Sequence, residues 1–246
     1  MYKDLINEVF TSVFRNKYIL IKALLIPFVL LLLITYFNEQ YKDSGFLKIF
    51  LGILSYLVTV SIAITTHRIL LLGENAVPTW GVLNLTSREI KFILNTLWIG
   101  VLIGLSVLLF GVFSALFASI FSFTSELLVI VFIVFIALLG IYFFTRVSLI
   151  FPSIAVDDKL DIVDSIEYTK NHKLLVFFVV GIFPIIITLL VGSVYGLVIG
   201  FLVGVVSSNL SVLYSVLDLF ITVFVISSLS STYKFLKKEK LENKQE

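Results

Sequence analysis

The longest apolar run in this chain spans residues 174–206 and contains no Asp, Glu, Lys, Arg or His. As a helix it would be longer than the ~30 Å hydrocarbon core of a bilayer, at about 1.5 Å per residue. Other apolar runs cover residues 18–37, 46–72, 90–120, 127–151 and 210–233. Runs of this length, without the short polar and apolar alternation of a membrane β-barrel, predict transmembrane helices.

Composition supports this class, because only 14% of the residues are charged and 59% are apolar, whereas soluble domains have about 25% charged residues. We therefore expect an all-α polytopic protein with six transmembrane helices. Its parts would be an interfacial amphipathic helix at 1–17, one membrane domain at 18–233 and a charged tail at 234–246. A second interfacial segment is expected at 160–172.

The basic residues predict the orientation of these helices. Sixteen of the eighteen Lys and Arg residues fall in the N-terminal segment, the second and fourth connections and the tail, and only Lys42 and Lys48 fall elsewhere. The positive-inside rule then places both termini in the cytoplasm. We expect a multi-pass protein of a bacterial inner membrane. The net charge of +2 gives no reason to expect a nucleic-acid partner.

Three similar segments close the predicted helical hairpins: Thr66-His67-Arg68, Thr145-Arg146 and Thr232-Tyr233-Lys234. They suggest a threefold repeat of one amphipathic segment and one hairpin, with Arg68, Arg146 and Lys234 at the cytoplasmic interface. The alternative is that the topology rule alone places a basic residue at each of these helix ends.

Two features inside the spans are candidates for packing or function. Gly192, Gly196, Gly200 and Gly204 recur on one helix face, which predicts close packing within the bundle, between copies of the chain or around a pore. Asp218 is the one carboxylate well inside a span, and Tyr214 and Thr222 lie one turn away. This trio fits a proton or cation site, or an acid that faces a wet crevice.

The remaining polar residues give little indication of chemistry. There is no cysteine, no nucleotide-binding or hydrolase motif, and no metal-site spacing around His67 or His172, so we expect no enzyme, no cofactor and no metal. Five acids lie between Asp157 and Glu167. Either they form the solvated face of an interfacial helix, or they bind a basic partner or a divalent ion.

Residues 146–157 read R-V-S-L-I-F-P-S-I-A-V-D, and they are followed by Asp164-Ser165 and Thr169-Lys170. This segment resembles the R-x-x-L-x-x-P-x-x-A-V pattern of a group of bacterial six-helix membrane proteins of uncharacterised function. The group includes the YciC family and the membrane domain of some glycerophosphoryl diester phosphodiesterases. Only a short tail follows Lys234 in this sequence, so we do not expect the phosphodiesterase catalytic domain. The resemblance implies the fold and an inner-membrane location, and it implies no catalytic residue.

Two functions are compatible with these features. The first is a non-enzymatic scaffold or accessory protein that associates with membrane lipids, as a homo-oligomer or in a membrane complex. The second is a small transporter or channel with a site at Asp218.

Overall fold

The computed structural model describes residues 1–41, 43–81, 84–121 and 126–242. Within them, six helical segments are long and apolar enough to cross a membrane, and this confirms an all-α, polytopic membrane protein. Of the residues discussed above, Lys42 and residues 243–246 of the tail lie outside the described residues.

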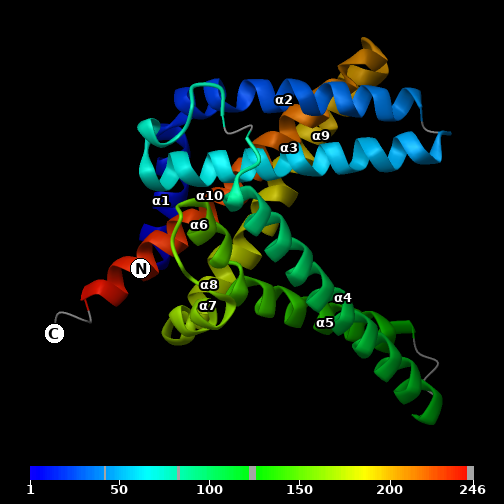
Figure 1. The fold of residues 1–246 in the computed structure, drawn as a ribbon. Helices are drawn as coiled ribbons and strands as arrows, with labels where there is room; N and C mark the ends of the chain where they lie inside the picture. Colours follow the sequence, from blue (N-terminus) through cyan, green and yellow to red (C-terminus); the bar gives the residue numbers. More distant parts are fainter. Residues whose placement is uncertain (42, 82–83, 122–125, 243–246) are drawn as a thin grey trace.

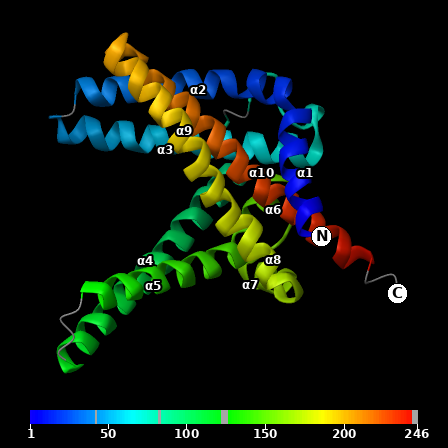
Figure 2. The ribbon, with the colours of Figure 1, turned by 180° about the vertical axis from the view of Figure 1, so that it is seen from behind.

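The spans form three helical hairpins (Figure 1). The first hairpin is α2 (Lys17–Gln40) and α3 (Gly45–Leu72), and the second is α4 (Ser87–Phe121) and α5 (Glu126–Val147). The first arm of the third hairpin consists of α8 (Lys173–Val176), the π-helical segment η3 (Phe177–Ile182) and α9 (Phe183–Val205). The short helix η4 (Ser208–Ser211) connects it to the second arm, α10 (Val212–Glu242). Figures 1 and 2 show that the second hairpin diverges from the first, so the three do not form a parallel bundle.

The end of the molecule where the hairpins converge is called the base. Besides the helix ends, it contains α1 (Tyr2–Arg15), η1 (Glu74–Ala76), α6 (Ile150–Ala155), α7 (Ile162–Tyr168) and η2 (Lys170–His172). The N-terminus and the C-terminal part of the last helix, α10, lie at this end (Figure 1). The base therefore brings together the segments in which the sequence concentrates its basic residues.

The fourth predicted span is observed, but its helix is interrupted near the end of the span. Its helix stops at Val147 and not at residue 151, and a separate buried helix, α6, follows from Ile150. Pro152 lies in the first turn of α6, where its missing N–H is tolerated, whereas in a continuous helix its ring would clash with the preceding turn. The short α6 thereby becomes part of the base.

The charged tail also differs from the expectation. Helix α10 continues past Tyr233 to Glu242 without a break. Lys and Glu are good helix formers, and Leu236 within this extension is buried, so one side of it packs on the base. The last span and the described part of the tail are one helix.

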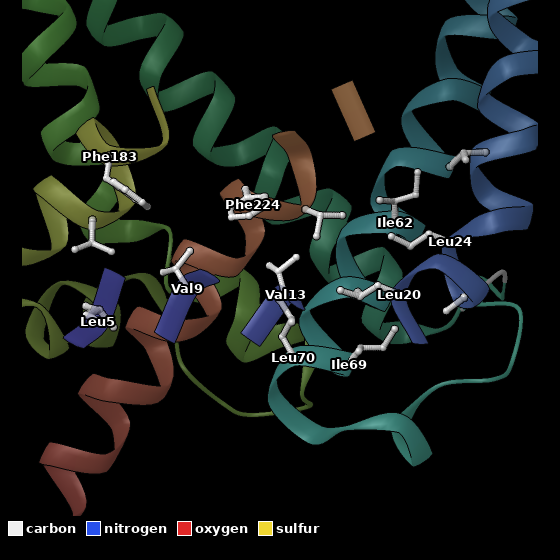
Figure 3. Close-up of a cluster of buried hydrophobic side chains, with 14 of the residues drawn as sticks. Leu5, Val9, Val13, Leu20, Leu24, Ile62, Ile69, Leu70, Phe183 and Phe224 are labelled. Carbon is white, nitrogen blue, oxygen red and sulfur yellow. The ribbon is translucent and has the colours of Figure 1, made fainter. Parts of the chain in front are cut away.

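The apolar face of α1 was predicted to lie in the plane of the membrane interface. In the structure Leu5, Val9 and Val13 on that face are buried against other helices, chiefly α10. Figure 3 shows Val9 and Val13 near Phe224 of α10, with Leu5 further along α1. The apolar face of α1 therefore packs against other helices, whereas a free amphipathic helix would turn this face to the lipid.

The fifth span changes its helical geometry just before Pro184. The chain widens into a π-helix over Phe177–Ile182, and Pro184 occupies the first turn of α9. A π turn removes the clash between a proline ring and the preceding carbonyl. Within this turn, a Cβ on Gly181 would lie 2.6 Å from Ile141 Cγ2 of α5, so glycine allows the second and third hairpins to approach closely.

Candidate functional site at the base of the hairpins

Two adjacent carboxylates connect the three hairpins at the base. Asp157 follows α6 in a left-handed conformation, with φ of 60°, which Asp tolerates better than most residues. Asp157 Oδ2 accepts a hydrogen bond from Arg68 Nη1 at 2.9 Å, and Asp157 Oδ1 accepts one from Arg88 Nε at 2.8 Å. Arg68 ends the first hairpin and Arg88 begins the second, so one carboxylate joins both.

The neighbouring carboxylate, Asp158, reaches the third hairpin. It accepts hydrogen bonds from the Tyr233 hydroxyl and the Lys237 ammonium, one turn apart on α10. We call Asp157, Asp158 and their four partners Arg68, Arg88, Tyr233 and Lys237 the hub. The hub holds the base together through charge-assisted hydrogen bonds, which are stronger than neutral ones.

The hub favours the ionised form of both acids. Partial burial opposes ionisation of Asp157, but the hydrogen bonds from Arg88 and Arg68 outweigh it and lower the pKa of that carboxyl. Hydrogen bonds from Lys237 and Tyr233 lower the pKa of Asp158. Both groups are therefore carboxylates at neutral pH.

The three basic residues predicted at the interface occupy equivalent places. Arg68 Nε donates to the Ala76 carbonyl at 2.9 Å, Arg146 Nη2 donates to the Ile166 carbonyl at 2.6 Å, and Lys234 Nζ lies 3.2 Å from Glu8 Oε1. Each residue ends one hairpin and contacts the segment that precedes the next hairpin, with Lys234 returning to α1. This cyclic order is what a threefold repeat would produce.

A row of small polar residues on α10 faces the base. Ser227 to Thr232, apart from Leu229, are Ser or Thr, and all of them are buried. Ser227 Oγ lies 2.8 Å from Ser12 Oγ and donates to the Val9 carbonyl, and Ser230 Oγ lies 2.8 Å from His67 Nδ1. Small side chains let helices approach closely and bond to one another in a membrane. His67 is thus a buried packing residue of the base.

Asp218 lies outside the base. Its side chain is exposed on α10, and it makes no hydrogen bond or ion pair within the described part of the chain. Tyr214 turns to the neighbouring helix, where its hydroxyl donates to the Gly196 carbonyl at 3.4 Å, and Thr222 is half-buried. The predicted trio does not converge on a common point.

Three of the four regularly spaced glycines face open space. No atom lies within 4 Å of a Cβ built on Gly192, Gly196 or Gly204, and at Gly200 the neighbour is the Tyr214 hydroxyl at 3.5 Å. Among the described residues, no backbone atom of another helix lies within 4 Å of the Cβ atoms built on these four glycines. Packing within the described chain therefore uses this face little, and lipid or another chain can cover it.

The acids of residues 157–167 do not form one cluster. Asp157 and Asp158 belong to the hub, and Asp161 caps α7 by accepting a hydrogen bond from the Asp164 backbone N–H at 2.7 Å. The described residues contain no group of three or more His, Asp or Glu side chains that could hold a metal ion.

Two adjoining hollows open on the base beside η2. The larger, of about 340 Å³, is lined by residues of α7, η2 and α10, among them Tyr168, Lys170, His172, Glu239 and Lys240. The smaller, of about 280 Å³, shares Lys170, Asn171 and His172 and continues past Lys173 and Leu174 to the start of α1. Lys240 Nζ lies 3.9 Å from the centre of the Tyr168 ring, and His172 Nε2 lies 2.7 Å from Glu239 Oε1.

The sequence did not identify the hub, although it lies at the end of the segment that carries the family resemblance. The sequence grouped Asp157 and Asp158 with three other acids, and it singled out Tyr233 only as part of a segment that closes a hairpin. One signal was present in the sequence: two acids directly follow a Pro-containing turn between hairpins rich in basic residues. That signal gives no partner, because the partners lie as many as 89 residues away.

No protein-family model matches this chain, and searches of curated proteins and of solved structures find no match. The site has to be interpreted from its own geometry.

Proposed function

We propose that this chain is a non-enzymatic scaffold or accessory protein that associates with lipids in a bacterial inner membrane, with both termini in the cytoplasm. In this proposal the base faces the cytoplasm and holds the hairpins at fixed angles. The diverging hairpins present apolar flanks to lipids and to other membrane chains. The proposal includes membership of the six-helix group that the 146–157 segment resembles, and it involves no cofactor.

One observation carries the proposal: the hairpins are joined at the base and separate away from it (Figure 2). In the most apolar stretch of α4 only 6% of the residues are buried, and the same holds for α5, against 33% for the two long helices of the third hairpin. A closed bundle around a transport path would bury its helices more evenly. A splayed hairpin instead exposes both of its sides to the surrounding membrane.

The transporter alternative rests on Asp218, and no observation in the described structure favours it. None of the three hollows that are described, including a narrow one between Pro184 and Ser228, is lined by Asp218. The residue lies on the outer side of α10, without the partners or the enclosed space that an ion site in a membrane needs.

Site-directed spin labelling can test the proposal, and the absence of cysteine makes single-cysteine variants straightforward. Labels at Leu108 on α4 and Val134 on α5, whose side chains are 60% and 51% exposed, report on the flanks of the second hairpin. A label at position 218 reports on the transporter alternative. In lipid nanodiscs we expect all three labels to be accessible to dissolved oxygen and protected from a water-soluble nickel reagent.

The opposite pattern would support transport. Nickel access at position 218, continuing along one face of α10, would show a hydrated path and would overturn the scaffold proposal. Exclusion of both reagents from Leu108 and Val134 would show that another protein chain covers the second hairpin. This result would support a scaffold that acts within a membrane complex.

A further inference from the structure

The two hollows beside η2 are lined by lysines that have no ion-pair partner among the described residues. Lys170 lines both hollows, Lys240 lines the larger and Lys173 the smaller, and none of the three forms an ion pair within the described residues. Elsewhere on the base, Arg68, Arg88 and Lys237 are all paired with acids of the hub. These lysines are therefore available to a ligand.

We infer that this place is a binding site for the headgroup of an anionic phospholipid. The phosphate would lie between Lys170 and Lys240, with Asn171 as a further donor. Ammonium and amide groups that converge on a concave surface are suited to phosphate oxygens. The inference rests on the proposed lipid association and adds the lipid class and the residues.

The acids beside these lysines do not cancel the positive charge. Glu239 lines the larger hollow but is bonded to His172, and Glu167 is the one carboxylate there without an ion-pair partner among the described residues. Three unpaired ammonium groups against one free carboxylate favour a ligand with net negative charge. A zwitterionic headgroup such as phosphocholine gains less at such a site.

The position of the hollows favours a lipid over a soluble phosphate. The apolar span of the third hairpin begins at Lys170, directly at the site. Leu174 lines the smaller hollow with 72% of its side chain exposed, next to the buried Leu175. A headgroup on the lysines would thus have its acyl chains along an exposed apolar helix face. The ring of Tyr168 holds Lys240 at the rim through a cation–π contact.

The test is lipid binding by the full-length chain in detergent, measured by native mass spectrometry with dioleoyl phosphatidylglycerol and with dioleoyl phosphatidylcholine. The variant K170Q/K240Q removes the two lysines, and K159Q/K238Q is the matched control, since Lys159 and Lys238 are exposed on the base and line neither hollow. We expect K170Q/K240Q to bind phosphatidylglycerol roughly tenfold more weakly, because it loses charge-assisted bonds. The control should stay within about twofold of the wild type.

Two results would overturn the inference. The first is equal binding of phosphatidylglycerol by K170Q/K240Q and the control. The second is displacement of the lipid by deacylated glycerophosphoglycerol at the same concentration, which would assign the site to a soluble phosphate. Binding retained by K170R/K240R would show that charge, and not the shape of lysine, is required. Thermal unfolding of each variant confirms that it folds, and the spin-label result on the second hairpin is independent of this outcome.

Discussion

The base and the second hairpin are built from similar apolar helices, yet they pack very differently. At the base, the ends of α3, α6 and α10 bury Ser, Thr and His side chains and meet the charged groups of the hub. In the outer part of α4 and α5 almost nothing is buried. Lipid tails are as apolar as leucine, so apolar helices gain little from leaving lipid for each other. Close packing therefore occurs where polar and small residues make it specific.

The comparison can be tested most directly with one substitution made in both regions. Leu5→Ala removes a side chain that is 4% exposed, and Leu108→Ala removes one that is 60% exposed. We expect Leu5→Ala to lower the free energy of unfolding by about 2–5 kcal/mol, because it leaves a cavity, and Leu108→Ala to change it by less than about 0.5 kcal/mol. Reversible unfolding in mixed micelles gives both values. A similar loss at both positions would mean that the second hairpin is packed as well as the base.

The hub should account for a further part of this difference. Arg68→Ala removes the hydrogen bonds of a mostly buried guanidinium to Asp157 and to the Ala76 and Ala155 carbonyls. A loss of about 1.5–3 kcal/mol in unfolding free energy is expected in the same assay. Arg15→Ala, at an exposed residue whose ion pair to Glu8 is 3.9 Å long, is the matched control and should change little. If both variants changed the unfolding free energy equally, the hub would not contribute to stability as proposed.

Glycine offers a third pair of variants. Gly181→Ala places a methyl group 2.6 Å from Ile141 Cγ2, so we expect a loss of about 1–3 kcal/mol from overpacking. Gly192→Ala meets no atom within 4 Å, and the higher helix propensity of alanine should leave stability unchanged or raise it by up to about 1 kcal/mol. The ranking of the two melting temperatures checks this. Destabilisation by Gly192→Ala together with a loss of oligomer would instead show that copies pack on the open glycine face.

The smallest expected effect is a pH dependence of the base. The pKa values of Asp157 and Asp158 are lowered in the folded chain, so their contribution to stability is present above the unfolded value of about 3.9 and is lost as the pH falls through the folded values. Unfolding midpoints measured from pH 6 to pH 2 should fall at the acidic end. The double variant D157N/D158N should be less stable at neutral pH and should show a flatter profile. An unchanged profile would mean that other carboxylates dominate.

The sequence predicted the six spans well because each depends on local composition. Residues 46–72 were predicted and Gly45–Leu72 is the observed helix, since the ends of an apolar run can be found without knowing its neighbours. The helix boundary at Val147 was missed because it depends on Pro152 and on the burial of α6. The continuation of α10 was missed because it depends on Leu236 packing against the base.

The candidate site was predicted less well, for a related reason. Arg68, Arg146 and Lys234 were found by their place at helix ends, and each makes an interhelical contact at the base. The glycine row was chosen for its regular spacing, but among the helical glycines the tightest contact with another helix is at the isolated Gly181. Asp218 was chosen because it is a charge in a span, and it lies exposed.

The sequence by itself determined that this chain spans a membrane six times as helices, because apolar length and unsatisfied backbone groups leave no other structure in hydrocarbon. Only the tertiary structure decided where the helices meet: at Asp157 and Asp158, at Gly181 and along the serines of α10. Between apolar helices, packing is selected by a few polar bonds and by side-chain shape across large sequence separations, and neither can be inferred from local hydropathy.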